Sequence, residues 1–197
     1  ACAGAESKGS SAARRAAFLD QAPKASDFLR SKGMQLVHGE GYSDYHETEY
    51  PGGVARSRSV MPKIFDLAEL GDKAGWIDWT GEFPPMMTHE TFHLTRFGRD
   101  WKSREIMLRV GWRMMQNKLF KRKLVGTGYS LQGRLLQIAL KEKLDIWIDS
   151  PVIGLISENG RVTGVVARRQ GKEVRVEARD GVLINADGTP GHDNLLL

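Results

Sequence analysis

The spacing of apolar residues changes abruptly after Leu140. Before that point, residues 131–140 carry apolar side chains every three or four positions, which predicts a helix with Leu131, Leu135, Ile138 and Ala139 on its packed side. After it, apolar and polar residues alternate, which predicts four strands over 145–149, 152–157, 161–168 and 172–178. The Asn159-Gly160 pair is typical of a hairpin turn. A helix followed by an antiparallel meander therefore restricts the fold more than any other feature.

The stretch from Gly181 to Ala186 follows the meander and is almost continuously apolar. It predicts a short strand covered on both faces, as in a parallel sheet. Ala186 and Gly188 stand at the carboxyl end of this strand. Ligands of open α/β sheets bind at that edge, where small residues let the backbone approach a phosphate. The order of elements predicts an α/β fold, part of a Rossmann-like nucleotide-binding domain whose parallel sheet is interrupted by an antiparallel β-meander.

The N-terminal region has the composition of a helix. A helix is predicted over residues 10–32, capped by Ser10 or Ser11 and interrupted by Pro23. The region after residue 60 is rich in Trp and Met, part loop and part helix, and we interpret it as an insertion. The chain is thus predicted to have three parts: an N-terminal helical segment with the loop that follows it (1–60), a Trp- and Met-rich basic insertion (61–127), and a helix with the β-meander (128–197).

The chain contains one cysteine, Cys2, which excludes an internal disulfide and a cysteine metal cluster. We therefore expect a reducing, cytoplasmic compartment. No apolar run approaches the ~18 residues of a membrane span. The sequence lacks an initiator Met and stops at Leu195-Leu196-Leu197 soon after a predicted strand, so we expect a fragment of a longer protein.

Positive charge is concentrated in residues 96–123, which hold ten basic residues against two acidic ones. Met107, Val110 and Met114 are spaced as on a helix, and we expect the Met- and Trp-bearing side to pack inward while the basic residues are solvated. The best functional use of this segment is a peripheral contact with a membrane, which suits a lipid-like substrate. A non-catalytic module that binds nucleic acid is a less favoured alternative.

A zinc-dependent hydrolase is the alternative enzyme class, because His89, Glu90 and His93 complete a His-Glu-x-x-His motif. On a helix the two histidines share a face and could hold Zn²⁺, with Glu90 activating water. No third ligand follows at the expected spacing, since Arg96 stands three residues past His93. We therefore favour two solvent-facing histidines and no metal.

Two groups of residues resemble a known family. The C-terminal group is similar to the flavoproteins of the fumarate reductase, succinate dehydrogenase and 3-ketosteroid 1-dehydrogenase family, over residues 133–136, 144–152, 156–165 and 178–186. The N-terminal group resembles the ketosteroid dehydrogenase branch, which carries an Asp-Tyr pair and a Gly-rich, Arg-Ser segment, over residues 41–45, 51–53 and 56–59. The resemblance implies part of an FAD-binding domain with a helical insertion, and FAD as the cofactor.

The resemblance also implies an activity. The family removes a proton alpha to the ketone of a 3-ketosteroid and passes a hydride to flavin, which introduces a double bond between C1 and C2. Tyr45 matches the tyrosine that lines the pocket and supports the catalytic base. Val152 matches the strand residue that meets the adenine end of FAD, and Ala186 and Gly188 match small residues near its phosphates. A steroid-like small molecule is the implied substrate.

Two departures from the family concern the cofactor. The Gly-rich loop that holds the pyrophosphate is missing, since no Gly-x-Gly-x-x-Gly occurs in the chain. Asp187 stands where the family has the first of two glycines, and its carboxylate would be repelled by a pyrophosphate. We therefore expect the chain by itself to bind FAD weakly or not at all.

Overall fold

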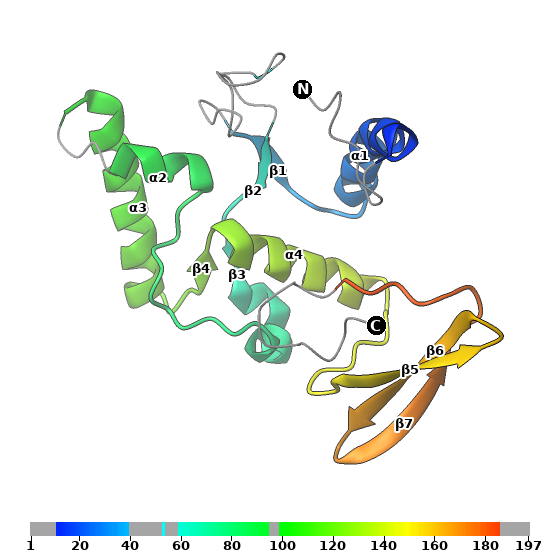
Figure 1. Ribbon diagram of the computed structural model, residues 1–197. Helices are drawn as coiled ribbons and strands as arrows, with labels where there is room; N and C mark the ends of the chain where they lie inside the picture. Colours follow the sequence, from blue (N-terminus) through cyan, green and yellow to red (C-terminus); the bar gives the residue numbers. More distant parts are fainter. Residues whose placement is uncertain (1–10, 40–52, 54–58, 95–98, 186–197) are drawn as a thin grey trace. The chain divides into compact units, whose positions relative to one another are not determined.

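The computed structural model describes residues 11–39, 53, 59–94 and 99–185 (Figure 1). The chain forms two compact units, residues 1–144 and 145–197. The three-part division with boundaries at residues 60 and 127 stays a prediction.

Helix α1 (Ala12–Ser31) begins as the sequence predicts. The side chain of Ser11 accepts a hydrogen bond from the backbone N of Arg14 at 3.3 Å, which satisfies one free N–H group of the first turn. The helix ends before Gly33, whose φ of 106° is the left-handed conformation common after helices. The predicted interruption at Pro23 is wrong. Proline removes one backbone hydrogen bond and displaces a carbonyl, and α1 accommodates this because none of its residues is buried and held in place.

Short strands and a 3₁₀ helix form the centre of the first unit. Antiparallel pairs join β1 (Leu36–His38) to β2 (Val60–Pro62) and β3 (Phe65–Asp66) to β4 (Leu124–Val125), and the 3₁₀ helix η1 spans Leu67–Trp76. The buried core consists of Phe65, Leu67, Leu70 and Val125. Strands this short carry no alternating pattern, which is why none was predicted between residues 61 and 127.

Helix α4 (Thr127–Lys141) packs with a different face from the predicted one. Its buried residues are Ser130, Gly133 and Arg134, whereas Leu131 and Leu135 are exposed. The reason is the ring of Phe65, which lies so close that a Cβ at Gly133 would stand 2.6 Å from its Cδ1. The small glycine lets the core approach this side of the helix, so the apolar residues on the other side stay outside.

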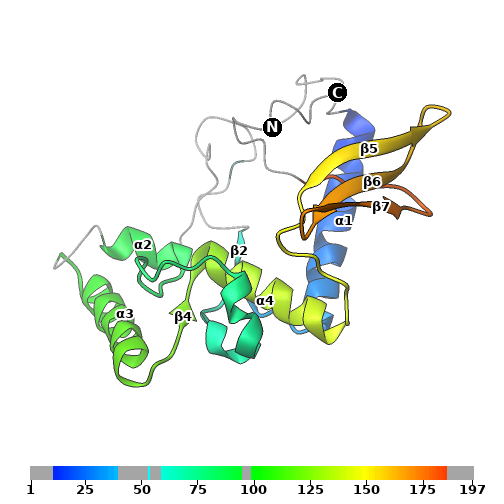
Figure 2. The ribbon, with the colours of Figure 1, turned by 90° about the horizontal axis from the view of Figure 1, so that it is seen from below.

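Helices α2 (Thr88–Leu94) and α3 (Trp101–Leu119) lie side by side (Figures 1 and 2). The predicted inward side of α3 is only partly correct. Val110 is buried, but the rest of the packed side is formed by Ser103 and Ile106, while Trp101 and Met114 are exposed. Ion pairs to α2 set this rotation, as described below. No helix in the described ranges is long and apolar enough to cross a membrane.

The side chain of Asn117 acts as a strand neighbour for β4. Its Oδ1 accepts a hydrogen bond from Leu124 N at 2.8 Å, and its Nδ2 donates one to Leu124 O at 3.1 Å. We expect Asn117→Leu to lower the free energy of unfolding by about 1–3 kcal/mol, because both backbone groups of Leu124 lose their partner. Urea denaturation measures this loss, with Gln116→Ala as a control expected to change stability by less than about 0.5 kcal/mol. Equal losses in the two variants would contradict this role.

The second unit contains the predicted meander. Strands β5 (Val152–Glu158), β6 (Arg161–Arg169) and β7 (Lys172–Glu177) pair antiparallel in that order (Figure 1). Asn159 and Gly160 turn between the first two with φ of 51° and 76°, as the Asn-Gly signal predicts. Three of the four predicted strands are therefore confirmed within a residue of their boundaries.

Two predicted strands are not formed. Residues 145–149 make no strand, and residues 181–185 lie in irregular backbone with Leu183 92% exposed. Both stretches are apolar enough for a strand but find no hydrogen-bonding neighbour in the described part of the chain, where every strand pair is antiparallel. The parallel sheet expected from the sequence is thus not among the described elements.

Candidate functional site

The pair β1–β2 joins the two ends of the segment that carries Tyr45. His38 stands opposite Val60, and Gly39 N donates a hydrogen bond to Ser59 O at 2.9 Å. The ends of the segment between residues 39 and 59 are thereby held next to each other. Tyr45 itself lies outside the described residues, so its role as a pocket residue stays a prediction.

Strand β2 of this pair is held from α2. Met61 is buried, and its Sδ lies 3.1 Å from Nδ1 of His89. Further along, Lys63 N donates to Gln35 O at 3.0 Å, which continues the connection to the β1 side. His89 is therefore used in packing against β2 rather than facing solvent as predicted.

Arg134 is a buried cation that the sequence did not single out for a role. Its Nη2 donates to Ile64 O at 2.8 Å and its Nε to Lys63 O at 3.4 Å, while its guanidinium lies 5.0 Å from the centre of the Phe65 ring. Burial lowers the pKa of Arg134, and the charge of Glu69 opposes this. Arg134 fixes the backbone that follows β2. The sequence signal that could have indicated this role is a charged residue next to apolar residues within a predicted helix.

The His-Glu-x-x-His motif lies on α2, but its glutamate is engaged elsewhere. Glu90 is fully buried, its Oε2 accepts a hydrogen bond from Met87 N at 2.8 Å, and the same atom lies 2.6 Å from Arg113 Nη1. Glutamate at the third position of a helix, bonded back to the N-cap backbone, is half of a capping box. A carboxylate neutralised in this way is not free to activate water.

The zinc alternative finds no support in the geometry. No three His, Cys, Asp or Glu side chains gather as a metal site in the part of the chain that the structure describes. His89 contacts Met61, and the half-buried His93 has a buried Nδ1 with no hydrogen-bond partner. The motif is explained by the capping and ion pairing of Glu90 and by the contact of His89 with Met61.

Three residues are predicted to contact FAD, and Val152 is the one that falls within the described ranges. It is the first residue of β5, opposite Ala167, and its side chain is 44% exposed. A ligand can reach such a position, and its role stays a prediction. Ala186 and Gly188 lie outside the described residues.

A strand–glycine–helix connection is a common place for a pyrophosphate, and Gly126 joins β4 to α4 in that way. Here the glycine serves packing. A Cβ at Gly126 would overlap the carbonyl oxygen of Met86, so protein backbone occupies the space that a phosphate would need. The described residues do not by themselves form a cradle for the FAD pyrophosphate.

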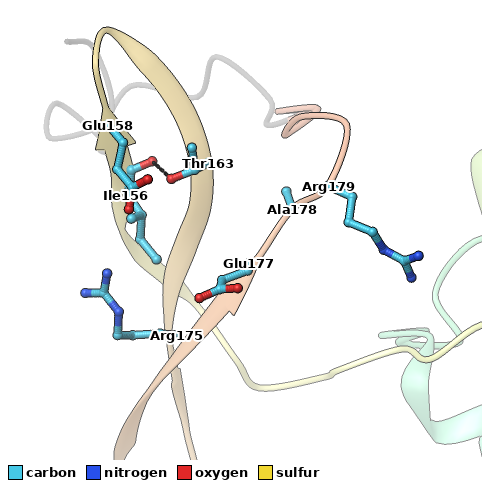
Figure 3. A pocket seen from close by; sticks show the side chains of 7 residues that line it. All are labelled: Ile156, Glu158, Thr163, Arg175, Glu177, Ala178 and Arg179. Atoms are coloured by element: carbon cyan, nitrogen blue, oxygen red, sulfur yellow. Dashed lines mark hydrogen bonds between the residues drawn. The ribbon is translucent and has the colours of Figure 1, made fainter.

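The meander carries a shallow hollow of about 280 Å³ (Figure 3). Thr163 Oγ1 donates to Ile156 O across it at 3.4 Å, and Arg179 points away from the other side chains. Two arginines and two glutamates offset one another around it, which gives no preference for an anion. The residues that line it are Ile156, Glu158, Thr163, Arg175, Glu177, Ala178 and Arg179. Its size falls below the roughly 300–1,000 Å³ of small-molecule sites, and we assign it no ligand.

Comparison with known proteins supports the resemblance found in the sequence. Residues 1–196 match a family described as an FAD binding domain. The 3-oxosteroid 1-dehydrogenase of Comamonas testosteroni is 30% identical over 191 residues, which cover 87% of this chain and 32% of that protein. The enzyme of the same name from Mycolicibacterium smegmatis is 32% identical over 182 residues, with the same coverage. The chain therefore spans about a third of the length of these relatives.

A solved structure agrees with these matches. The crystal structure of 3-ketosteroid delta1-dehydrogenase from Sterolibacterium denitrificans, in complex with 1,4-androstadiene-3,17-dione, superimposes with a TM-score of 0.69 at 26% identity. The superposition covers 83% of this chain and 31% of that one. These matches confirm the predicted α/β FAD-binding fold, the resemblance to ketosteroid dehydrogenases, and FAD as the cofactor of the family.

Proposed function

Because this chain belongs to the FAD-binding domain family, we propose that it acts in the FAD-dependent dehydrogenation of a 3-ketosteroid, which introduces a double bond between C1 and C2. The observation that carries this proposal is similarity along nearly the whole chain to enzymes of that activity, in sequence and in fold.

Tyr45 is the chain's proposed contribution to the chemistry. Removal of a proton alpha to a ketone near neutral pH needs a base whose basic form is stabilised in the site. A tyrosine hydroxyl that hydrogen-bonds the base from the side of the pocket provides this, and it holds the base toward the steroid. The pair β1–β2 holds the two ends of the segment that contains Tyr45, His89 contacts Met61 of β2, and Arg134 bonds the backbone that follows β2.

Val152, Ala186 and Gly188 are the proposed contacts to FAD. Val152 would meet the adenine end at the start of β5, and the two small residues would approach the phosphates. Completion of the pyrophosphate site requires groups that the described residues do not supply.

The role of Tyr45 is tested in a chimera in which residues 1–197 replace the matching third of the Comamonas testosteroni enzyme. We expect Tyr45→Phe to lower kcat for a 3-ketosteroid about 10²-fold, since general acid–base assistance contributes factors of this order, with little change in flavin content. Tyr50→Phe, in the same loop, is the matched control and is expected to keep its turnover. Unchanged turnover in Tyr45→Phe would refute the assigned role.

The proposal also includes a peripheral contact of residues 96–123 with the cytoplasmic surface of a membrane. Steroids partition into lipid, and a basic segment favours the vicinity of anionic headgroups. An enzyme held there would meet its substrate at a higher local concentration.

A further inference from the structure

Helix α3 has two apolar sides, and its own unit covers one of them. The packed side holds Ser103, Ile106 and Val110. On the opposite side, apolar residues recur at intervals of seven, four, three and four, and 44–78% of each side chain is exposed: Trp101, Leu108, Trp112, Met115 and Leu119. We call these five residues the outer stripe. A helix that is apolar on opposite sides needs a second apolar environment.

The orientation of α3 is fixed, so the outer stripe cannot turn inward. Arg113 is held by Glu90 at 2.6 Å and by the carbonyl of Pro85 at 3.1 Å. Nearly three turns of helix before Arg113, the side chain of Ser103 is buried in the first turn, and Asn117 binds Leu124 near the last turn. Rotation would break all of these contacts.

The charges beside the outer stripe are positive. Lys102, Lys118, Lys121 and Lys123 are exposed and form no ion pair with the residues that the structure describes. The acidic residue on this helix, Glu105, is paired with Arg109 at 2.5 Å. The stripe is therefore bordered at both ends of α3 by cations without an ion-pair partner among the described residues, which fits a surface that combines an apolar phase with negative charge.

We propose that α3 docks on the surface of an anionic lipid bilayer. The outer stripe enters the boundary between headgroups and acyl chains, and the lysines contact lipid phosphates, as amphipathic helices do when they lie in the plane of a membrane. This inference rests on the proposed membrane contact of the function above and assigns it to particular side chains. A nucleic acid fits less well, because Leu108, Met115 and Leu119 occupy the middle of the surface where its phosphates would lie.

Vesicle flotation of the purified chain tests this docking. We expect binding to phosphatidylcholine vesicles that contain phosphatidylglycerol, and much weaker binding to phosphatidylcholine alone. The double variant Leu108→Gln/Leu119→Gln is expected to weaken binding at least about tenfold. Lys118→Gln/Lys121→Gln is expected to weaken it about thirtyfold, since each lysine near an anionic surface contributes roughly a factor of five.

Matched controls change the same residue types elsewhere. Leu183→Gln/Ile184→Gln replaces exposed apolar residues outside α3, and Lys143→Gln/Lys172→Gln removes exposed charges; both are expected to bind vesicles like the unchanged chain. Circular dichroism confirms that every variant is folded.

Three results would overturn the proposal. One is vesicle binding that Lys118→Gln/Lys121→Gln abolishes and Leu108→Gln/Leu119→Gln leaves unchanged, which would show that the chain binds any polyanion through charge alone. Another is no vesicle binding, with a concentration-dependent dimer that Leu108→Gln/Leu119→Gln dissociates. The third is no binding to either vesicle. Flotation needs neither FAD nor turnover, so a failure of the proposed dehydrogenation leaves this result interpretable.

Discussion

Glu90→Ala is expected to lower the free energy of unfolding by about 3–5 kcal/mol, the cost of removing one partner of a buried ion pair. Glu90 is fully buried, and it joins the start of α2 to Arg113 of α3. Its other oxygen lies 3.6 Å from Arg109. Without the carboxylate, the mostly buried Arg113 keeps only the carbonyl of Pro85, and the N-cap amide of Met87 loses its acceptor.

Urea denaturation followed by tryptophan fluorescence measures the effect of Glu90→Ala. Glu105→Ala is the matched control, because it removes an exposed partner of Arg109 and is expected to cost less than about 1 kcal/mol. Elemental analysis measures zinc in the unchanged chain and in the variant. Stoichiometric zinc in the unchanged chain, lost in a Glu90→Ala variant of unchanged stability, would show that the motif is a metal site.

Gly126→Ala is the second change with a large expected effect, a loss of about 3 kcal/mol or more. The added Cβ would overlap the carbonyl oxygen of Met86. The contact joins the backbone of Gly126 to the backbone of Met86, and neither can move aside as a flexible side chain does. Gly126 is held in place because it lies between β4 and α4. The connection would have to shift, and with it Val125, which belongs to the buried core.

Gly128→Ala is the control for Gly126→Ala, two residues further along. No atom lies within 4 Å of a Cβ built at Gly128, which stands in the first turn of α4. Alanine there is expected to raise the free energy of unfolding by roughly 0.5–1 kcal/mol, because it restricts the unfolded chain and favours the helix. Destabilisation of similar size by both changes would contradict the close contact at Met86.

Local signals in the sequence were sufficient for the meander and for the start of α1. Alternation and an Asn-Gly turn specify β5 and β6 without distant partners, and Ser11 caps its own helix. Helix faces were harder to predict, because they depend on contacts far apart in sequence. The ring of Phe65 against Gly133 turns α4, and Glu90 with Arg113 turns α3.

The candidate site could be approached only in part from the sequence. The resemblance pointed to Tyr45 and Val152. A resemblance of motifs does not show which buried side chains support strands β1 and β2 on either side of the segment that contains Tyr45. Arg134 was among the matched residues, yet its bonds to the carbonyls of Lys63 and Ile64 arise from packing across about 70 residues of chain. The two apolar stretches that form no strand show the same limit, since apolar sequence alone does not provide a hydrogen-bonding neighbour.

Flavin content and steroid turnover of the unmutated chimera test most directly whether residues 1–197 are part of a ketosteroid dehydrogenase. We predict a yellow protein with stoichiometric FAD by absorbance that dehydrogenates a 3-ketosteroid, whereas the chain by itself takes up little FAD. A folded chimera that stays colourless with excess FAD, or that holds FAD and leaves the steroid unchanged, would contradict the assignment.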